Sequence, residues 1–464
     1  MSELKLITGH AGTVLVGQLA TMAYGVADTL IAGHFSDAAL ASLSVGSAIY
    51  ISVYVGLMGV VQALLPIWAE LHGGNKQKAL GQSLRQSIYL VVLLAAVGML
   101  ALMFPGPLLR WAQVPELMLG EVQQYLKVLA FAFLPALLFR VYSSFNQSLG
   151  KPVLVTWLQV GALTVKIPLS IWLVGGGSGV APMGAVGCAW ATFAVNYLLL
   201  TLAVLMLRGN AMYQPYEIWK AMEKPDWPQI RQFVRLGIPG GLAYMVEVTS
   251  FTLMAVFIAR LGTEASASHQ IAASIAAVLY MMPLSMAIAS SARVSFWLGA
   301  GRPDTAKHIV VLALSLTALT SIAFAALILT ANEWLAGLYS PNPEIVRIGS
   351  GLLLWAAVYH VADATQAVCA FLLRCYRITI APLVIYGVLL WGLGLQGGYL
   401  LSYSGVAGHA PSQSPSSFWA ASTVALVFVA CSFLFLLRRA TNKLPPELED
   451  GSPVWGSRQP QRRA

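Results

Sequence analysis

Apolar runs recur along the whole chain, and a transmembrane helix needs about 20 mainly apolar residues. Short stretches rich in Gly, Pro and Ser, such as 104–107, 175–179 and 402–417, separate the runs. This alternation predicts twelve membrane-spanning helices and places both chain ends on one side of the membrane. The predicted spans are 11–33, 46–69, 84–104, 124–145, 153–175, 184–207, 236–260, 271–298, 309–330, 349–373, 380–402 and 418–437.

The composition places the same chain in a bilayer. Of its 464 residues, 58% are hydrophobic and 10% are charged, and the mean hydropathy is +0.73. A soluble protein carries about 25% charged residues, so this chain lacks the polar surface that water requires. The net charge of +9 therefore does not indicate a nucleic-acid partner. The four cysteines have no CxxC or Cys/His spacing, which predicts neither a disulfide framework nor a zinc site.

The positions of the basic residues predict the orientation. With a cytoplasmic N-terminus, most of the 27 Lys and Arg residues fall in cytoplasmic segments, while Arg110 and Arg347 fall in outer loops. Cytoplasmic loops of membrane proteins are enriched in Lys and Arg. We therefore expect a multi-pass membrane protein with both termini cytoplasmic.

The two halves of the chain repeat each other. The turn after the second span and the turn after the eighth superpose at a shift of 226, which aligns Gly73 with Gly299 and Lys76 with Arg302. Lys151-Pro152 and Ala381-Pro382 open the fifth and eleventh spans at a shift of 230. Six-helix repeats are a transporter architecture in which the substrate site lies between the halves. The repeat predicts an N-terminal lobe at 1–207, a cytoplasmic linker at 208–232 and a C-terminal lobe at 233–440. The Pro- and charge-rich composition of 441–464 predicts a disordered cytoplasmic tail.

Two acidic residues of the second half lie inside predicted spans, where an ionisable side chain costs several kcal/mol and is a functional candidate. Glu247 shares a helical face with Tyr244, and Asp363 shares one with Tyr359 and Gln366. Two carboxylates in a low dielectric cannot both stay charged and unpaired. Either one binds a proton or both share a cation, which predicts an ion-coupling site.

The first half holds one such acid, Asp28. It follows small residues on its helix face, and a neighbour can approach such a face closely. The fifth span offers a counter-charge in Lys166, with Ser170 one turn later. We interpret these three residues as a polar network, with structural pairing and snorkelling of Lys166 as alternatives.

At this point the chain resembles the multidrug and toxic compound extrusion (MATE) family, NorM-like branch, over nearly its whole length. The motifs that carry the resemblance are short stretches whose order and spacing match. They begin at Ala27 (ADTLIAG), Ala41 (ASLSVG), Glu247 (EVTSF), Leu261 (LGTEA), His269 (HQIA), Met282 (MPLS) and Tyr359 (YHVAD).

The resemblance implies two pseudo-symmetric six-helix lobes that form a V-shaped central cavity and open alternately to each side. It implies export of organic cations driven by Na⁺ or H⁺. The family's second-lobe cation site maps onto Glu247, Asp363 and Tyr359, and its first-lobe acid maps onto Asp28. Tyr24, Tyr244, Phe251, Gln270 and Met282 are candidates for the substrate cavity, with ordinary core packing as the alternative.

One departure from the family concerns the fifth span. Relatives carry Asn before the Ile-Pro-Leu motif and Asn or Asp one turn later, whereas this chain has Lys166 and Ser170. A fixed cation beside Asp28 would offset its charge and compete with a proton or a cationic drug. We therefore hypothesise that coupling relies on Glu247 and Asp363, with Asp28–Lys166 a largely structural pair.

The expected function is secondary active antiport of lipophilic, often cationic, compounds in exchange for Na⁺ or H⁺, by a monomer that needs no cofactor. Na⁺ binding to Glu247 and Asp363 is the metal interaction this predicts. No Walker A sequence is present, which argues against direct ATP drive. Three alternatives stay open: an exporter or flippase of an endogenous metabolite or lipid-linked precursor, a membrane-embedded enzyme, and a channel.

Overall fold

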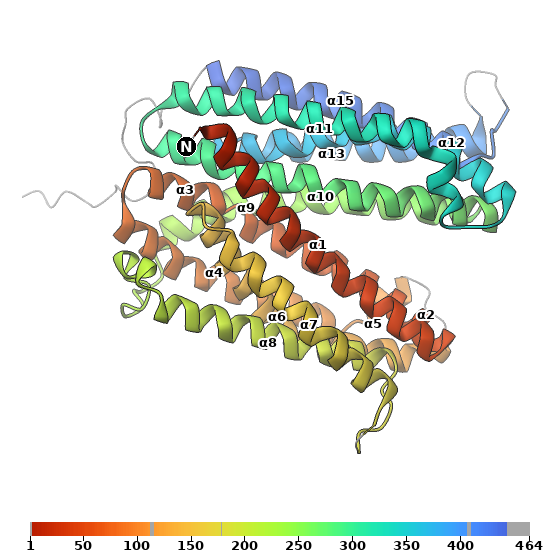
Figure 1. Ribbon diagram of the computed structural model, residues 1–464, viewed down its shortest axis with the longest axis horizontal. Helices are drawn as coiled ribbons and strands as arrows, with labels where there is room; N and C mark the ends of the chain where they lie inside the picture. The colour runs from red at the N-terminus through yellow and green to blue at the C-terminus, as the bar shows by residue number, and fades with distance from the viewer. Residues whose placement is uncertain (1, 112–115, 178, 406–409, 443–464) are drawn as a thin grey trace, which may run out of the picture. The chain divides into compact units, whose positions relative to one another are not determined.

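The computed structural model describes residues 2–111, 116–177, 179–405 and 410–442, and nearly all of them are helical (Figure 1). Of the predicted tail, residues 443–464 lie outside the described part of the chain. The elements of the first half are α1 (Glu3–Phe35), α2 (Asp37–Gln62), α3 (Leu65–Gly73), α4 (Gln77–Met103), α5 (Gly106–Trp111), α6 (Glu116–Ser148), α7 (Val153–Gly175), α8 (Ala185–Gly209) and the 3₁₀ turn η1 (Ala211–Tyr216). The second half contains α9 (Trp227–Ala259), α10 (Thr263–Gly299), α11 (Pro303–Gly337), α12 (Pro343–Cys375), α13 (Ile380–Tyr386), η2 (Gly387–Gln396), α14 (Gly397–Tyr399), η3 (Leu400–Ser404) and α15 (Pro415–Asn442).

Twelve helices in the described residues are long and apolar enough to cross a membrane, which confirms the predicted spans. Two of these spans are composite. The second joins α2 and α3 around Ala63 and Leu64, where Pro66 in the first turn of α3 cannot donate a backbone hydrogen bond. The eleventh runs from α13 to η3 and includes the π-helical segments η2 and η3. Wide π-helical turns are rare and often lie at functional sites.

The sequence repeat has a counterpart in the backbone. α3 and α10 end at Gly73 and Gly299, a shift of 226, and α6 and α12 cover 116–148 and 343–375, a shift of 227. Each pair of helices ends in the same way, because a left-handed residue follows at the corresponding position. These residues are Asn75 (φ 56°) and Gly301 (φ 69°) after the first pair, and Gly150 (φ 68°) and Arg377 (φ 62°) after the second. Such a residue lets the chain turn back and satisfy the last carbonyls of the helix.

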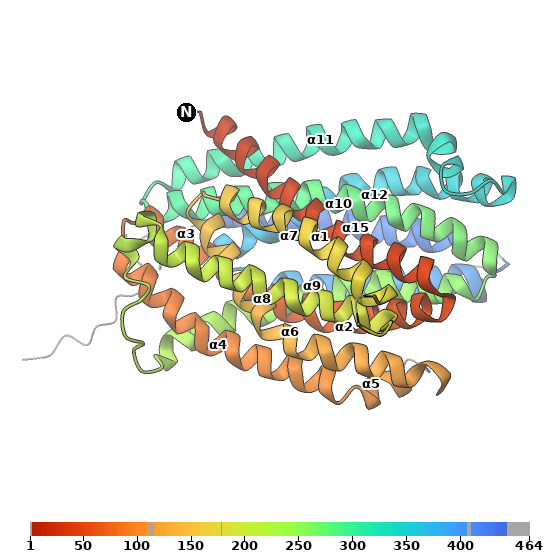
Figure 2. The same ribbon diagram turned by 60° about the horizontal axis from the view of Figure 1, so that its bottom comes forward.

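Contacts between Cα atoms divide the described residues into two compact units, one of 16–241 and one that combines 2–15 with 242–442. In the first unit, α6 packs against α2, α4 and α8; in the second, α12 packs against α10, α11 and α15 (Figures 1 and 2). α6 and α12 are the helices related by the shift of 227. Each unit is therefore built around the same member of its half of the repeat.

Small residues allow the close packing around α6. A Cβ atom on Gly46 of α2 would lie 2.5 Å from the ring of Tyr125, and one on Gly98 of α4 would lie 2.4 Å from the ring of Phe133. Both aromatic side chains belong to α6 and are buried. Glycine is therefore required at these two positions by close approach between helices.

Polar contacts fix the segment between the two halves to the start of α4. The guanidinium of buried Arg85 donates to Glu223 (Nε to Oε2, 2.9 Å), and the hydroxyl of Tyr89 donates to the Glu223 carbonyl (2.8 Å). The side chain of Gln86 donates to the Lys224 carbonyl and accepts from the Asp226 amide. The hydrogen bond from Arg85 lowers the pKa of Glu223 below its ordinary value.

Candidate functional site: two buried polar clusters

The first cluster contains the two acids of the second half. Glu247 extends from α9 and Asp363 from α12, and the side-chain amide of Gln366 lies between them. Gln366 Nε2 donates to Glu247 Oε1 (2.7 Å) and to Asp363 Oδ1 (3.0 Å). Asp363 and Gln366 are buried, with 7% and 1% of their surfaces exposed, respectively. Two carboxylates in apolar surroundings are thus joined by a neutral donor.

A tyrosine fixes the orientation of this amide. The hydroxyl of Tyr386, on α13, donates to Gln366 Oε1, so the amide nitrogen is left to face the carboxylates. The π-helical segment η2 is tied to α9 beside Glu247. Trp391 Nε1 donates to the Val246 carbonyl (3.3 Å), and Ser250 Oγ donates to the Leu390 carbonyl (3.4 Å). The geometry of the site therefore depends on the relative positions of three spans, which contain α9, α12 and α13 with η2.

A small cavity of about 20 Å³ adjoins Glu247 and Gln366. A water molecule needs at least about 10–15 Å³, so the space accommodates a water-sized species or a small dehydrated cation. Asp363 contacts this region through Gln366. The cavity is lined by Glu247, Ser250, Phe251, Met254, Tyr359, Gln366, Leu390, Ser422 and Leu426.

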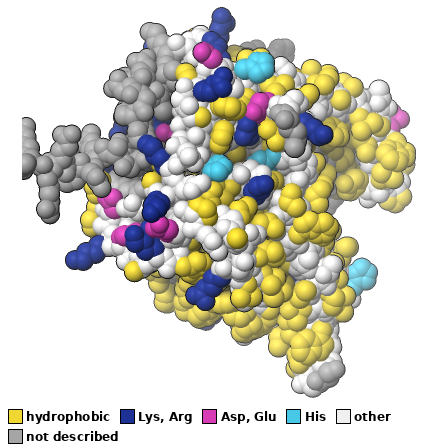
Figure 3. Space-filling model, turned by 60° about the vertical axis from the view of Figure 1, so that its left-hand side comes forward, with side chains coloured by type: hydrophobic (Ala, Val, Ile, Leu, Met, Phe, Trp, Pro, Cys, Tyr) yellow, Lys and Arg dark blue, Asp and Glu magenta, His cyan; other side chains and the backbone are white. Residues whose placement is uncertain are grey.

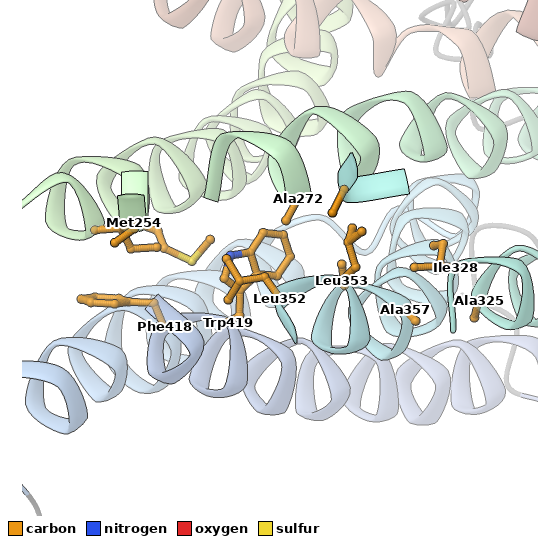
Figure 4. Close-up of a cluster of buried hydrophobic side chains, with 13 residues drawn as sticks. Met254, Ala272, Ala325, Ile328, Leu352, Leu353, Ala357, Phe418 and Trp419 are labelled. Atoms are coloured by element: carbon orange, nitrogen blue, oxygen red, sulfur yellow. The ribbon is translucent and has the colours of Figure 1, made fainter. Parts of the chain in front are cut away.

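Aromatic rings form the apolar side of the cavity. The ring of Tyr359 lies 6.4 Å from that of Phe251 and 5.5 Å from that of Trp419. Trp419 Nε1 donates to Nδ1 of buried His269 (3.2 Å). Figure 4 shows Trp419 within the buried hydrophobic cluster between α10, α12 and α15, beside Met254 and Leu352. These rings place apolar surface beside the carboxylates, and a lower local dielectric strengthens electrostatic interactions.

The second cluster lies in the first half and contains its own cation. Lys166 Nζ, on α7, lies 2.9 Å from Asp28 Oδ2 on α1 and 2.8 Å from Thr192 Oγ1 on α8. Ser170 Oγ donates to Asp28 Oδ1 (3.1 Å). Lys166 has 2% of its surface exposed, so its ammonium is enclosed rather than extended toward the membrane surface. The structure thus brings Asp28, Lys166 and Ser170 together as one ion-paired network.

The five cavity candidates do not gather in one place within their units. Tyr280 donates to Tyr244 between hydroxyls (3.3 Å), and Phe251 belongs to the aromatic wall described above. Tyr24 donates to the Gln159 carbonyl (2.5 Å). Gln270 donates to Ser274 (3.3 Å), and the sulfur of Met282 accepts from Thr320 (3.4 Å). Their assignment to a substrate cavity stays a prediction.

Sequence reasoning did not assign roles to Gln366, Tyr386 and Thr192. Gln366 contacts Glu247, Thr192 contacts Lys166, and Tyr386 contacts Gln366. Gln366 had a signal, since it shares the face of Asp363 three residues away. Tyr386 and Thr192 had none, because they come from other spans. Among the described residues, no group of three or more His, Cys, Asp and Glu side chains is placed to hold a metal ion. A cation at the first cluster would therefore rely on the two carboxylates together with neutral oxygens.

Comparison with known proteins gives one family. A family model described as MatE matches residues 14–172 and 239–400, so both halves are covered. The chain is 37% identical over 433 residues to a probable multidrug resistance protein NorM of Aromatoleum aromaticum, covering 92% of each chain. It is 32% identical to a protein of the same description in Chromobacterium violaceum, over 96% of this chain and 95% of the relative. It is 29% identical to the multidrug resistance protein PmpM of Pseudomonas aeruginosa, over 95% and 92%.

Solved structures share the fold. The eukaryotic MATE transporter AtDTX14 superposes with a TM-score of 0.86 at 20% identity, covering 98% of this chain and 99% of the other. The MATE transporter VcmN of Vibrio cholerae superposes with a TM-score of 0.82 at 15% identity, covering 95% and 97%. The arrangement of the helices is thus shared by proteins whose sequences have diverged widely.

Proposed function

The chain belongs to the MatE family of membrane transporters, and from this premise we propose that it is a secondary active antiporter that exports lipophilic organic cations in exchange for Na⁺ or H⁺. Membership of a transporter family excludes the membrane-embedded enzyme. The names of the relatives, multidrug resistance proteins, support drugs and related xenobiotics as the exported class. The bacterial relatives and the twelve spans support a multi-pass protein of the inner membrane.

The observation that carries the proposal is the pair of carboxylates joined by one amide. With both acids ionised, the site would hold two like charges in a low dielectric, so it gains free energy by binding one proton or one small cation. Na⁺ would meet carboxylate oxygens and, in the adjoining cavity, the oxygens of Ser250 and Tyr359. A proton would be shared by the coupled pair rather than belong to one acid. Both coupling ions fit, and the experiment below separates them.

Coupling follows from differential affinity. The proposed lobes, 1–207 and 233–440, alternate between two arrangements about the linker 208–232, with both termini cytoplasmic. The ion binds more tightly to one arrangement of the lobes and the exported compound to the other. Binding of either one therefore shifts the population of arrangements toward the form that releases the other. The protein acts as a monomer in this scheme, because each half supplies its own cluster within one chain.

The polar cluster of the first half is proposed to have a structural role rather than to bind the coupling ion. Asp28 and Lys166 neutralise each other, and Ser170 and Thr192 satisfy further hydrogen bonds. A second candidate function, export of an endogenous anionic or lipid-linked compound, drew its support from Lys166 as an intramembrane cation. The pairing of that ammonium with Asp28 removes this support and favours the cation exporter.

The test is transport by purified protein in liposomes loaded with a fluorescent lipophilic cation. An Na⁺ gradient and a pH gradient are imposed separately, and movement of the cation is followed. One of the two gradients should drive movement in the wild type and fail to do so in Asp363→Asn. Glu333→Gln, an exposed acid near the end of α11, is the matched control and should transport normally.

Failure of both gradients to move the cation with correctly folded protein would contradict the antiporter proposal. Movement that persists in Asp363→Asn would instead contradict the assignment of the coupling site. A current that dissipates the gradient without any exported compound would indicate a channel.

A further inference from the structure

The segment between the halves forms a hollow that the transport proposal does not use. It has a volume of about 360 Å³ and lies where α8 ends and the chain turns through η1. Its lining includes Leu207, Arg208, Glu217, Trp219 and Lys220. Pockets for small molecules begin at about 300 Å³, so the hollow accommodates a compact polar group.

An available cation lies at its edge. The Arg208 guanidinium stacks on the ring of Trp219, 4.5 Å from the centroid. Within the described part of the chain, no carboxylate forms an ion pair with Arg208. Trp219 is itself held in place, because its Nε1 donates to the Leu207 carbonyl (3.2 Å). The guanidinium is thus positioned on a fixed aromatic surface with its hydrogen-bond donors uncommitted to an acid.

The one acid of the hollow is already neutralised. Glu217 lies 2.9 Å from Lys78 Nζ and 3.8 Å from Lys220 Nζ. The hydrogen bond from Lys78 lowers the pKa of Glu217, so the carboxylate stays ionised and paired at neutral pH. Arg208 and Lys220 line the hollow together with this one acid, which Lys78 pairs from outside the lining. The hollow therefore has an excess of positive charge that suits an anionic group.

The surroundings place this hollow at a membrane surface. It lies at the end of the spanning helix α8, and Leu205, on the same face one turn before Arg208, has 58% of its surface exposed. Trp219 and Met222 in the linker are also exposed. Figure 3 shows Lys and Arg side chains on one face of the molecule beside a broad apolar surface. Tryptophan and basic residues are enriched where helices leave the hydrocarbon core.

We propose that the hollow binds the phosphate headgroup of an anionic phospholipid from the leaflet on the linker side. Arg208 and Lys220 pair with the phosphodiester, and Trp219 lies at the glycerol level. One acyl chain runs along Leu205 and the exposed apolar face of α8. A guanidinium suits this task because its planar donor fork matches two phosphate oxygens. Arg208, which has no acidic partner among the described residues, lies beside the exposed apolar face of α8. This combination favours a lipid over a free anion, because only a lipid has an acyl chain that gains free energy by contact with that face.

The experiment is lipid binding by the full-length protein, followed by native mass spectrometry in detergent with added phosphatidylglycerol or phosphatidylcholine. The wild type should prefer phosphatidylglycerol. Each basic residue near a membrane surface contributes about 1 kcal/mol, so Arg208→Gln with Lys220→Gln should weaken phosphatidylglycerol binding about thirty-fold. Phosphatidylcholine carries an ammonium that offsets its phosphate charge, so its binding should weaken less than that of phosphatidylglycerol.

The matched control is Arg302→Gln with Lys307→Gln. It removes the same charge, and Arg302 also stacks on a tryptophan, 5.5 Å from the centroid of Trp297, but neither residue lines the hollow. This variant should keep the preference. Equal losses in both double variants would overturn the proposal in favour of non-specific surface charge. An unchanged preference in Arg208→Gln/Lys220→Gln would overturn it outright.

Two further measurements keep the test decisive. Arg208→Lys retains the positive charge but loses the planar donor fork, so its preference should lie between those of the wild type and the double variant. This variant separates loss of charge from loss of fold. Inorganic phosphate at millimolar concentration should not displace phosphatidylglycerol. Displacement by phosphate alone would identify a free-anion site and contradict the lipid assignment. The result is independent of whether the protein exports drugs.

Discussion

Both halves of this chain carry acidic side chains inside their spanning helices, but the partners of these acids differ between the halves. Asp28 lies beside a covalently attached cation, Lys166, at 2.9 Å, whereas Glu247 and Asp363 share the neutral amide of Gln366. A side-chain ammonium cannot leave its site, but a proton or Na⁺ can. The halves therefore share an architecture, and in the proposed mechanism they differ in whether the counter-charge is permanent or exchangeable. Only an exchangeable counter-charge can couple one flux to another.

The largest effect should separate the clusters by transport. Glu247→Gln and Asp363→Asn each remove one carboxylate of the proposed ion site. Either change should reduce gradient-driven export to less than about a tenth of wild type, because the binding preference of the ion for one arrangement is lost. Lys166→Asn should retain export. If Lys166→Asn leaves transport untouched while Asp28→Asn abolishes it, the structural interpretation of the Asp28–Lys166 pair is wrong.

For the free energy of unfolding, the larger effect should come from the Asp28–Lys166 cluster rather than from the Glu247–Asp363 cluster. Lys166→Met leaves Asp28 buried without its cation and should lower the free energy of unfolding by about 3–5 kcal/mol. Asp28→Asn combined with Lys166→Met removes both charges and should recover most of that loss. Thermal melting in detergent measures both changes. A double variant as unstable as Lys166→Met alone would show that the pairing is not what the ammonium contributes.

The amide bridge gives an intermediate effect. Gln366→Leu removes hydrogen bonds to two carboxylates, and hydrogen bonds to charged groups contribute about 1.5–3 kcal/mol each. We expect the concentration of coupling ion at half-maximal transport to change by at least about tenfold. Tyr386→Phe, which removes only the group that orients Gln366, should change it by about fivefold. Equal effects of the two variants would mean that the tyrosine, not the amide, dominates.

A backbone substitution tests the repeat itself with a smaller effect. Gly150 has φ 68° after α6, and a Cβ there would meet nothing within 4 Å. Gly150→Ala should therefore destabilise by about 1–2 kcal/mol from conformation alone. Gly161→Ala in α7, where a Cβ also meets nothing within 4 Å, should be neutral or stabilising. Melting curves that fail to distinguish the two variants would argue against a left-handed cap at Gly150.

The smallest effect belongs to the ion pair outside the membrane. Because the pKa of Glu223 is lowered by Arg85, the pair stabilises the docked linker at pH above the ordinary carboxyl pKa of about 4.5. This contribution is lost as the pH falls through the lowered value. Proteolysis of the wild-type linker should therefore accelerate as the pH falls through this range. The linker of Glu223→Gln should be cleaved faster than that of the wild type at neutral pH, and its rate should change little with pH. The same pH slope in both proteins would contradict the assignment.

Sequence alone was sufficient for the spans, the repeat and the acids. Twenty consecutive apolar residues have few alternatives to a helix in a bilayer, because every backbone polar group must be satisfied internally. The corresponding ends of α3 and α10 followed from matching residues at a shift of 226, since a left-handed turn is a local property of the chain. Glu247, Asp363 and Asp28 stood out because ionisable residues inside spans are rare.

The tertiary structure decided what faces those acids. Gln366 and Glu247 are 119 residues apart, and Ser170 and Asp28 are 142 apart. Helical spacing shows which residues of one span share a face, but it does not show which neighbouring span that face meets. Gln366 became a bridge only because side chains of α9 and α13 reach it on α12 within hydrogen-bond distance. Lys166 became a buried partner only because α7 and α8 pack together beside Asp28 of α1. The sequence by itself determined which spans carry acidic residues, and only helix packing determined whether each acid meets a lysine or a neutral amide.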